Sequence, residues 1–357
     1  MVDIKKRIFL KKVLLTSPLL MSTNNIFSQN IASYKRIAVE ETFTIPEIVD
    51  ALRDYVSNNP DAEPGLSAPP YIVSETINTL YDLGKERISQ MDKANIDLQV
   101  LSLWSPGVQI FEPTQAEELS ILVNNHLAEA ISNYPSRFAG LATIAPQNPK
   151  KAGEEIERAI NNLNLNGVLI NSHTKGEFLD DPKFWTIFEA AESLDIPIYL
   201  HPRIPPKSMY QPYSKYLMDR ALWGYAAENS LHAVRLIMGG VFDQFPNLKI
   251  ILGHMGEGIP FWLSRMDSVA KRPGVTKIRY LPSEYFKNNF FITTSAMFSD
   301  PILDFCLNVV GEERIMFAVD SPFASSEDAT NWLDKANISD HEKQLIYNDN
   351  AVKIFNL

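Results

Sequence analysis

Short apolar runs recur along the chain, separated by segments with the amphipathic spacing of helices. The runs are rich in Ile, Val and Leu, which is typical of strands buried on both faces of a parallel sheet. We predict eight such strands, at residues 36–40, 98–103, 138–143, 166–171, 197–201, 249–253, 289–294 and 314–319. Strands that alternate with helices pair in parallel, and eight of them form a (β/α)8 TIM-type barrel. The long connections 44–80 and 202–227 are expected to be loop insertions that shape its catalytic face.

Four of these runs end on a side chain that can bind a metal or carry a proton. The residues at these ends are Glu40, His201, His254 and Asp320. In a barrel of this kind, catalytic residues come from the carboxyl ends of several strands at once. One such ending would mean little, but four of them predict a metal-centred active site.

Three of the four side chains suit a single divalent ion. Glu40, His201 and Asp320 would supply two carboxylate oxygens and one imidazole nitrogen to Zn²⁺ or Mn²⁺, leaving positions open for substrate. The alternation of a strand leaves the choice between Glu40 and Glu41 open, because neighbouring residues face opposite ways. His254 begins the string HMGEG, whose glycines allow a tight turn, and we interpret it as an acid–base or substrate-orienting group.

Composition excludes some partners and sites. The formal charge of −10 and the isoelectric point near 5.2 argue against binding to nucleic acid or to an anionic membrane. The single cysteine, Cys306, excludes an intramolecular disulfide. Three further histidines lie in helical or polar turn patterns and are interpreted as structural or solvated: His126, His232 and His341.

Residues 1–30 are predicted to be a leader rather than part of the barrel. A basic start that includes Lys6 and Arg7 precedes the apolar stretch VLLTSPLLM, which is too short to span a bilayer. The string KKRIFLKK resembles the twin-arginine export motif, with Lys6-Arg7 where two arginines are usual. We therefore expect an exported or periplasmic protein. A basic leader on a cytoplasmic enzyme is the alternative, since no clean A-x-A cleavage site follows.

Several strings together resemble a known family. They are IAVEETF, LGKERISQMD, INSHTKGEFLD, YLHP, FPNLKIILGHMGEG and MFAVDSPF. With these strings the chain resembles the amidohydrolase superfamily and, within it, the nonhydrolytic decarboxylases of 5-carboxyvanillate, γ-resorcylate and aminocarboxymuconate semialdehyde. The resemblance implies that residues 35–357 form a single amidohydrolase-type TIM barrel. It also implies a small carboxylate substrate and a homodimer or homotetramer.

The resemblance assigns roles to the residues at the strand ends. It implies that Glu40, the first glutamate of the strand-one motif, binds one metal ion together with His201 and Asp320. Asp320 and His254 would be the catalytic groups that deliver a proton. Glu257 would orient His254 or a substrate-binding arginine.

The resemblance also implies two arginines that bind the substrate. Arg87, in ERISQMD, and Arg265, in FWLSRMD, would hold its carboxylate or phenolate. Without the family match, a surface salt bridge is the preferred interpretation of each.

Three further residues are candidates for the pocket wall. Trp104 stands where the decarboxylases carry smaller or polar residues, and Phe323 lacks the hydroxyl of a tyrosine, so both suggest a less polar pocket. Trp104 could equally be a core residue. His173 follows the fourth predicted strand and could touch the substrate, or could cap its loop by hydrogen bonds.

The implied reaction is a metal-dependent loss of CO₂ from a hydroxylated aromatic or related unsaturated acid. Hydrolysis of a lactone, ester or amide, or a hydratase reaction, is the alternative on the same barrel. Many superfamily members carry His-x-His on the first strand, whereas this chain has Glu40 and Thr42 there. Two carboxylates nearly cancel the charge of a divalent ion, which disfavours an acidic metal-bound water and tilts the prediction towards decarboxylation. A barrel without activity is a third interpretation, disfavoured because the expected ligands are all present.

Overall fold

The computed structural model describes residues 34–61, 63–67 and 75–357, and one compact unit spans Tyr34–Leu357. The predicted leader, at residues 1–30, lies outside the described residues. In the described ranges, every helix is too short or too polar to cross a membrane.

The predicted strands are confirmed. They are β1 (Ile37–Phe43), β2 (Leu98–Leu103), β3 (Phe138–Gly140), β4 (Ala142–Thr143), β5 (Val168–Asn171), β6 (Pro197–His201), β7 (Lys249–Leu252), β8 (Phe290–Thr293) and β9 (Ile315–Met316). The single strand predicted at 138–143 is interrupted at Leu141 and appears as β3 and β4. All pairings are parallel, in the order β1-β2-β3 and β4-β5-β6-β7-β8-β9.

Backbone hydrogen bonds connect these two sheets into a barrel. The Leu141 amide donates to the carbonyl of Leu101, and the Ala142 amide donates to that of Gly167, so the ladder continues past the interruption. On the other side, the Val39 amide donates to Phe317, and the Asp320 amide donates to Glu40. The segment directly after β9 is therefore joined to β1, as the TIM-type fold requires.

The strands contribute side chains to two cores. One set faces the barrel interior and packs with the C-terminal helix; it includes Ile37, Val39, Leu98, Val100, Leu141, Tyr199, Ile251 and Met316. The alternate positions pack under the surrounding helices, as expected for strands buried on both faces.

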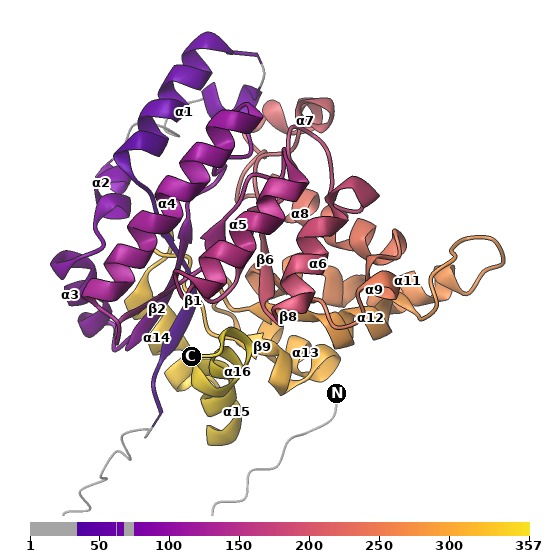
Figure 1. Ribbon diagram of the computed structural model, residues 1–357. Helices are drawn as coiled ribbons and strands as arrows, with labels where there is room; N and C mark the ends of the chain where they lie inside the picture. The colour runs from indigo at the N-terminus through magenta and orange to yellow at the C-terminus, as the bar shows by residue number, and fades with distance from the viewer. Residues whose placement is uncertain (1–33, 62, 68–74) are drawn as a thin grey trace, which may run out of the picture. The chain divides into compact units, whose positions relative to one another are not determined.

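Helices surround the strands (Figure 1). Their bounds are α1 (Pro46–Asn58), α2 (Glu75–Tyr81), α3 (Lys85–Lys93), α4 (Pro113–Asn133), α5 (Pro149–Asn161), α6 (Trp185–Ser193), α7 (Lys207–Ser214), α8 (Gly224–Met238), α9 (Val241–Gln244), α10 (His254–Glu257), α11 (Ile259–Ala270), α12 (Pro282–Asn289), α13 (Asp300–Val310), α14 (Ser326–Lys335), α15 (Asp340–Gln344) and α16 (Asn350–Phe355). Several helices, such as α1, α4 and α5, have proline in the first turn, where its fixed φ fits and no amide hydrogen is needed.

Local sequence explains the helical layer and the two long insertions. In α5, Ala152, Ile156 and Ala159 recur at helical spacing and are buried, while charged residues occupy the outer face. The connection 44–80 contains α1 and all but the last residue of α2, and the connection 202–227 contains α7 and the start of α8. Both insertions follow the carboxyl ends of strands.

Candidate metal centre

The three predicted metal ligands lie together at the carboxyl ends of the strands. Glu40 stands in β1, His201 is the last residue of β6, and Asp320 follows β9. One ligand atom of each residue lies within 4.8 Å of a ligand atom of the other two. Residues far apart in the sequence meet here because parallel barrel strands end at the same rim.

The two oxygen atoms of the Glu40 carboxylate have different surroundings. Oε2 accepts hydrogen bonds from the hydroxyls of Tyr199 and Thr293, the latter over 3.0 Å. Oε1 is buried without a hydrogen-bond partner among the described residues, and it lies 3.5 Å from Nε2 of His201. A buried polar atom without a partner costs about 1–3 kcal/mol. A divalent cation would satisfy Oε1, so the residues present fit a metal ion.

A glycine makes room for this carboxylate. A Cβ atom at Gly253 would lie 2.8 Å from Oε2 and 2.9 Å from Oε1 of Glu40. These distances are well inside van der Waals contact. Glycine therefore lets the end of β7 pass beside Glu40 and places the next residue, His254, at the site.

The structure decides between the two adjacent glutamates of β1. Glu41 accepts hydrogen bonds from the amides of Val319 and Ser321, over 3.0 and 3.2 Å. Burial raises the pKa of Glu41 to about 8, although these amides and Arg87 lower it. Glu41 thus ties β1 to the segment that carries Asp320, while Glu40 faces the metal centre. A register irregularity between Ala38 and Glu41 accompanies this arrangement.

The ring of His201 is oriented for metal binding. Its Nδ1 lies 3.0 Å from Oδ1 of Asn171, the last residue of β5. Because the amide oxygen only accepts, Nδ1 carries the hydrogen and Nε2 keeps its lone pair, which points towards Glu40. A second hydrogen bond of this kind usually fixes the tautomer of a metal-binding histidine.

His254 lies among three carboxylates. Its Nδ1 is 2.9 Å from Oε1 of Glu257, and its Nε2 is 3.8 Å from both Oε1 of Glu40 and Oδ2 of Asp320. Burial lowers the pKa of His254, but Glu257, Glu40 and Asp320 raise it, and the result is a pKa well above the ordinary value. Asn229 donates to the same Glu257 oxygen over 3.3 Å and helps to hold the pair. His254 can therefore store a proton beside the triad.

Burial and the neighbouring Glu40 raise the pKa of Asp320, while the nearby imidazole of His254 lowers it. The rise favours a protonated carboxyl, and a cation bound by the triad would oppose it.

Residues of the site adopt an uncommon backbone conformation. The φ angles of His254, Met255 and Glu257 are 51°, 55° and 54°, and that of Asp320 is 73°. For residues other than glycine, the left-handed region costs about 1–2 kcal/mol per residue. Such strain often gathers at functional sites, where the surrounding structure holds it in place.

The substrate-binding role predicted for Arg87 is not supported by its contacts. Its guanidinium is buried and donates to the carbonyls of Asp82 and Thr42, over 2.6 and 2.8 Å, and to Gln99 over 3.3 Å. Gln99 alternates with Leu98 and Val100, which face the barrel interior, so Arg87 lies on the outer face of the strands. The Arg87 guanidinium thus joins β1 and β2 through its hydrogen bonds to Thr42 and Gln99. The alternative interpretation, a surface salt bridge, is wrong as well, because Arg87 is buried.

Arg265 also lies away from the triad. It is exposed on α11 and lines an apolar groove of about 340 Å³ together with residues of α8, such as Val234 and Met238. The triad residues do not line this groove. Within one copy of the chain, Arg265 is therefore a surface residue.

The loop-capping alternative describes His173 better than substrate contact. His173 is fully buried; its Nδ1 accepts from the amide of Gly176 over 3.1 Å, and its Nε2 lies 3.0 Å from the carbonyl of Ile204. Burial and the nearby Arg203 hold its pKa well below the ordinary value. A neutral ring with both nitrogens bonded to backbone has no atom left for a substrate.

Trp104 and Phe323 both lie at the catalytic rim. Trp104 follows β2, is half-buried and packs against the main core, whereas Phe323 is 51% exposed in the turn after Asp320. The substrate contact predicted for each of them remains a prediction.

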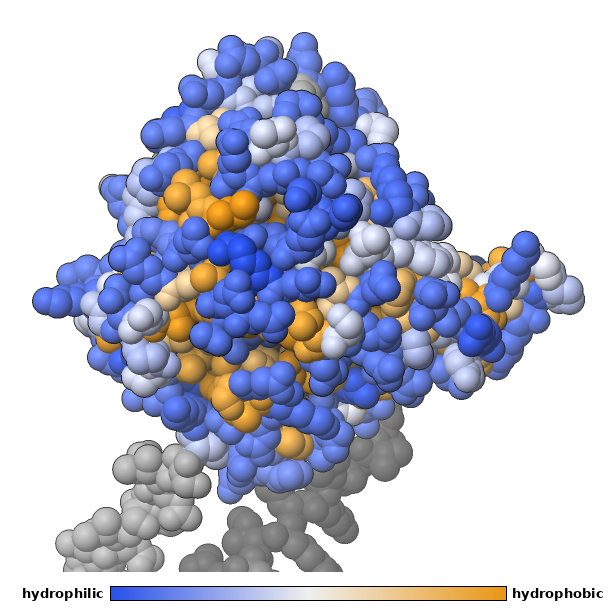
Figure 2. Space-filling model, viewed as in Figure 1, coloured by the Kyte–Doolittle hydropathy of each residue, from blue (hydrophilic) through white to orange (hydrophobic). Residues whose placement is uncertain are grey.

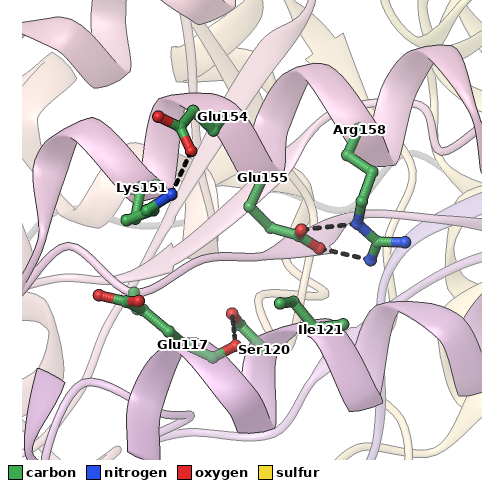
Figure 3. A pocket seen from close by; sticks show the side chains of 9 residues that line it. Glu117, Ser120, Ile121, Lys151, Glu154, Glu155 and Arg158 are labelled. Atoms are coloured by element: carbon green, nitrogen blue, oxygen red, sulfur yellow. Dashed lines mark hydrogen bonds and ion pairs between the residues drawn. The ribbon is translucent and has the colours of Figure 1, made fainter. Parts of the chain in front are cut away.

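A second groove, between α4 and α5, lies outside the metal centre (Figure 3). It has a volume of about 220 Å³, and its two cations, Lys151 and Arg158, are each paired with an acid of the same helix, Glu154 and Glu155. These pairs leave the cations already neutralised. The groove is therefore a poor candidate for an anionic substrate.

Several residues of the site were missing from the sequence-based prediction: Tyr199, Thr293, Ser295 and Asn229. The sequence contained a signal for Tyr199, because it precedes His201 by two positions in one strand and therefore shares the face of that strand. Thr293 and Asn229 had none, since their partners are distant in the sequence.

The sequence model of the amidohydrolase family matches residues 85–357. The chain belongs to this family. The predicted resemblance to its decarboxylase branch is confirmed as well. The γ-resorcylate decarboxylase of Polaromonas sp. (strain JS666) is 34% identical over 337 residues, which cover 90% of this chain and 98% of the relative.

Solved structures agree with this placement. The 5-carboxyvanillate decarboxylase of Sphingomonas paucimobilis matches with a TM-score of 0.87 and 40% identity, covering 91% of this chain and 100% of that chain. The 5-carboxyvanillate decarboxylase of Novosphingobium aromaticivorans, complexed with manganese and 4-hydroxy-3-methoxy-5-nitrobenzoic acid, matches with a TM-score of 0.87 and 36% identity. The match covers 92% of this chain and 97% of that chain.

Proposed function

We propose that the protein is a metal-dependent nonoxidative decarboxylase of hydroxylated aromatic carboxylic acids. The observation that carries the proposal is the convergence of Glu40, His201 and Asp320 beside a proton-holding His254. The relatives named above act on such acids, and the chain covers nearly their whole length.

Glu40, His201 and Asp320 would hold one divalent ion, either Mn²⁺ or Zn²⁺. A bound divalent ion would fix the substrate and draw electron density from its carboxylate and neighbouring hydroxyl. The manganese in the Novosphingobium structure supports this assignment.

Residues of the chain supply the proton that the ring carbon of the substrate receives. Glu257, whose oxygen lies 2.9 Å from Nδ1, favours the protonated form of His254 and fixes the direction of the ring. In the proposed reaction this proton moves, directly or through Asp320, to the ring carbon that bears the carboxylate. The bond to the carboxyl carbon then breaks, its electron pair restores the aromatic ring, and CO₂ leaves.

Hydrolysis remains the competing reaction, and one observation disfavours it. Thr42, which stands at the second position of the usual His-x-His pair, donates its hydroxyl to the carbonyl of Ser321 over 2.9 Å. The Thr42 hydroxyl is thus used to join β1 to the turn after Asp320. The first strand therefore supplies one metal ligand, Glu40, instead of the two of the His-x-His pair that many hydrolases of the superfamily carry.

The deciding assay measures CO₂ release from a panel of ortho-hydroxybenzoates and, in parallel, hydrolysis of lactones and esters. CO₂ release that depends on added Mn²⁺ or Zn²⁺ is expected. Hydrolysis without CO₂ release would select the alternative.

We also propose that the chain acts as a homo-oligomer, with the α11 face buried between copies. Phe261 and Trp262 on α11 are 71% and 52% exposed, and the ring of Phe305 on α13 lies 6.3 Å from that of Phe261. Figure 2 shows some hydrophobic side chains among hydrophilic ones at the right of the view, the side on which Figure 1 labels α11 and α12. Exposed aromatic patches of this kind are typical of association surfaces.

Arg265 lies on the same α11 face, so any contact with substrate would involve a second copy of the chain. Under this proposal, Arg265→Met raises KM about tenfold while kcat changes little, because a guanidinium mainly binds and orients a carboxylate. Light scattering of wild type and Phe261→Ser tests the interface. A wild-type monomer with full activity would reject both statements.

For residues 1–30 we propose an export leader, on the basis of the basic start and the short apolar stretch. Mass spectrometry of the mature N-terminus tests this proposal, and an intact leader on active cytoplasmic enzyme would contradict it.

A further inference from the structure

Two buried hydroxyls have no role in the proton transfer described above. Tyr199 lies in β6, two residues before His201, and Thr293 is the last residue of β8. Both are fully buried, and both donate to Oε2 of Glu40. Their position beneath a metal ligand suggests that they act through it.

The hydroxyls belong to a chain of hydrogen bonds that reaches the catalytic histidine. The amide of His254 donates to Oγ of Ser295 over 2.9 Å, and Ser295 lies 3.0 Å from Oγ1 of Thr293. Thr293 in turn donates to Glu40. The orientation of the Glu40 carboxylate is thus coupled to the backbone turn that positions His254.

This arrangement leaves only one Glu40 oxygen for a cation. Oε2 already accepts two hydroxyl hydrogens, whereas Oε1 has no donor among the described residues and faces His201 and His254. Rotation of the carboxylate to present both oxygens would break the bonds from Tyr199 and Thr293 inside the barrel, where water cannot replace them.

We propose that Tyr199 and Thr293 are positioning residues that make Glu40 a one-oxygen metal ligand and thereby tune the choice of metal. The inference rests on the proposed metal site. Zn²⁺ prefers few ligands, whereas Mn²⁺ accepts more carboxylate oxygens. Restricting Glu40 to one oxygen therefore keeps the site suited to Zn²⁺ and preserves open positions for substrate.

The test is a metal titration without substrate. Metal-free protein is titrated with Mn²⁺, following the paramagnetic resonance of the free ion, and Zn²⁺ is then added in competition. In Tyr199→Phe, affinity for both ions should fall about 10–100-fold because an outer hydrogen bond is lost. The preference for Zn²⁺ over Mn²⁺ should fall about tenfold as Glu40 gains a second ligand oxygen.

Thr293→Val should change the preference in the same direction, so the test does not depend on the folding of one variant. Thr294→Val is its matched control. Thr294 is the next residue along the chain and equally buried, but its hydroxyl donates to the carbonyl of Ala318 and accepts from the Ala318 amide. Tyr347→Phe is the matched control for Tyr199→Phe, since the buried Tyr347 hydroxyl bonds Asp334 and the Thr330 carbonyl. Both controls should leave the metal preference unchanged.

Crystal structures of the Mn²⁺-loaded proteins provide the second readout. Wild type should show one Glu40 oxygen on the metal, and Tyr199→Phe should show two. An unchanged preference in both site variants, or two Glu40 oxygens on the metal in wild type, overturns the inference. If wild type binds neither ion, the proposed metal site itself is wrong, whereas binding without CO₂ release contradicts the proposed reaction alone.

Discussion

Two groups of histidines show what separates a reactive site from a structural one. His173 and His232 lie between β5 and α8, and every ring nitrogen has a partner within the described residues. Burial lowers the pKa of both, to about 3 for His232. His254 is half-buried among carboxylates and has a raised pKa instead.

The difference lies in the neighbours rather than in burial. His232 accepts from the Leu179 amide and donates to Ser172, so its proton position is fixed and its charge is excluded. In the metal centre, Nε2 of His201 and Oε1 of Glu40 face one another without a hydrogen between them. Buried polar groups that converge with unused lone pairs therefore indicate a metal site. Buried polar groups whose atoms all have hydrogen-bond partners indicate a structural role.

The largest effect is expected from Asp320→Asn, which tests the reactive group directly. An amide at this position removes one negative ligand and cannot pass on a proton, so turnover should fall at least about 1000-fold. Circular dichroism and the unfolding midpoint should stay close to wild type. Asp300→Asn, on the exposed start of α13, is a control that should keep full activity. Retained turnover in Asp320→Asn would remove this residue from the mechanism.

Glu257→Gln should have the next largest effect. The change removes the carboxylate that contacts Nδ1 of His254, so turnover should fall about 10–100-fold. The pKa of His254 should also fall, because Glu257 is a main cause of its rise. The alkaline limb of the pH–rate profile should therefore move to lower pH. A lower rate with an unmoved limb would show that Glu257 acts only on structure.

The sequence could predict those parts of the site that have local signals. Apolar runs fix the strands, so His201 and Asp320, which directly follow such runs, could be assigned to the rim. Glu40 and Glu41 could not be separated by alternation, since the register irregularity in β1 and the partners of Glu41 belong to a distant segment.

Buried polar contacts are harder to predict, because their partners lie elsewhere in the chain. Arg87 is tied to the carbonyl of Thr42 and is not free to bind substrate. The glycines after His254 predicted a tight turn, but the left-handed backbone of His254 itself is imposed by its surroundings.

His232→Asn should affect stability rather than turnover, which sharpens the contrast between the two groups. The variant loses the acceptor for the Leu179 amide and the donor to Ser172, both buried. We expect a loss of about 1–3 kcal/mol in the free energy of unfolding. The kcat of the folded fraction should stay within about twofold of wild type. Urea unfolding and steady-state kinetics measure the two quantities. A large fall in kcat without destabilisation would place His232 in the reactive group.

The smallest expected effect is a pH trend in stability from Glu228, which accepts from Ser172 in the same structural group. Burial raises the pKa of Glu228 to about 8, although Ser172 and Arg203 lower it. In the unfolded chain its pKa is about 4.3. The folded protein therefore binds a proton that the unfolded chain has released, and this contribution to stability is complete below about pH 4.3 and is lost as pH rises towards 8. The Glu228→Gln variant lacks this titration. Relative to wild type, its urea midpoint should therefore rise between pH 5 and about 8, and the difference between the two midpoints should stay constant at higher pH. If the difference between the two urea midpoints stays constant over this range, Glu228 is already charged in the folded protein. The group around His173 and His232 would then contain a buried charge, as the metal centre does.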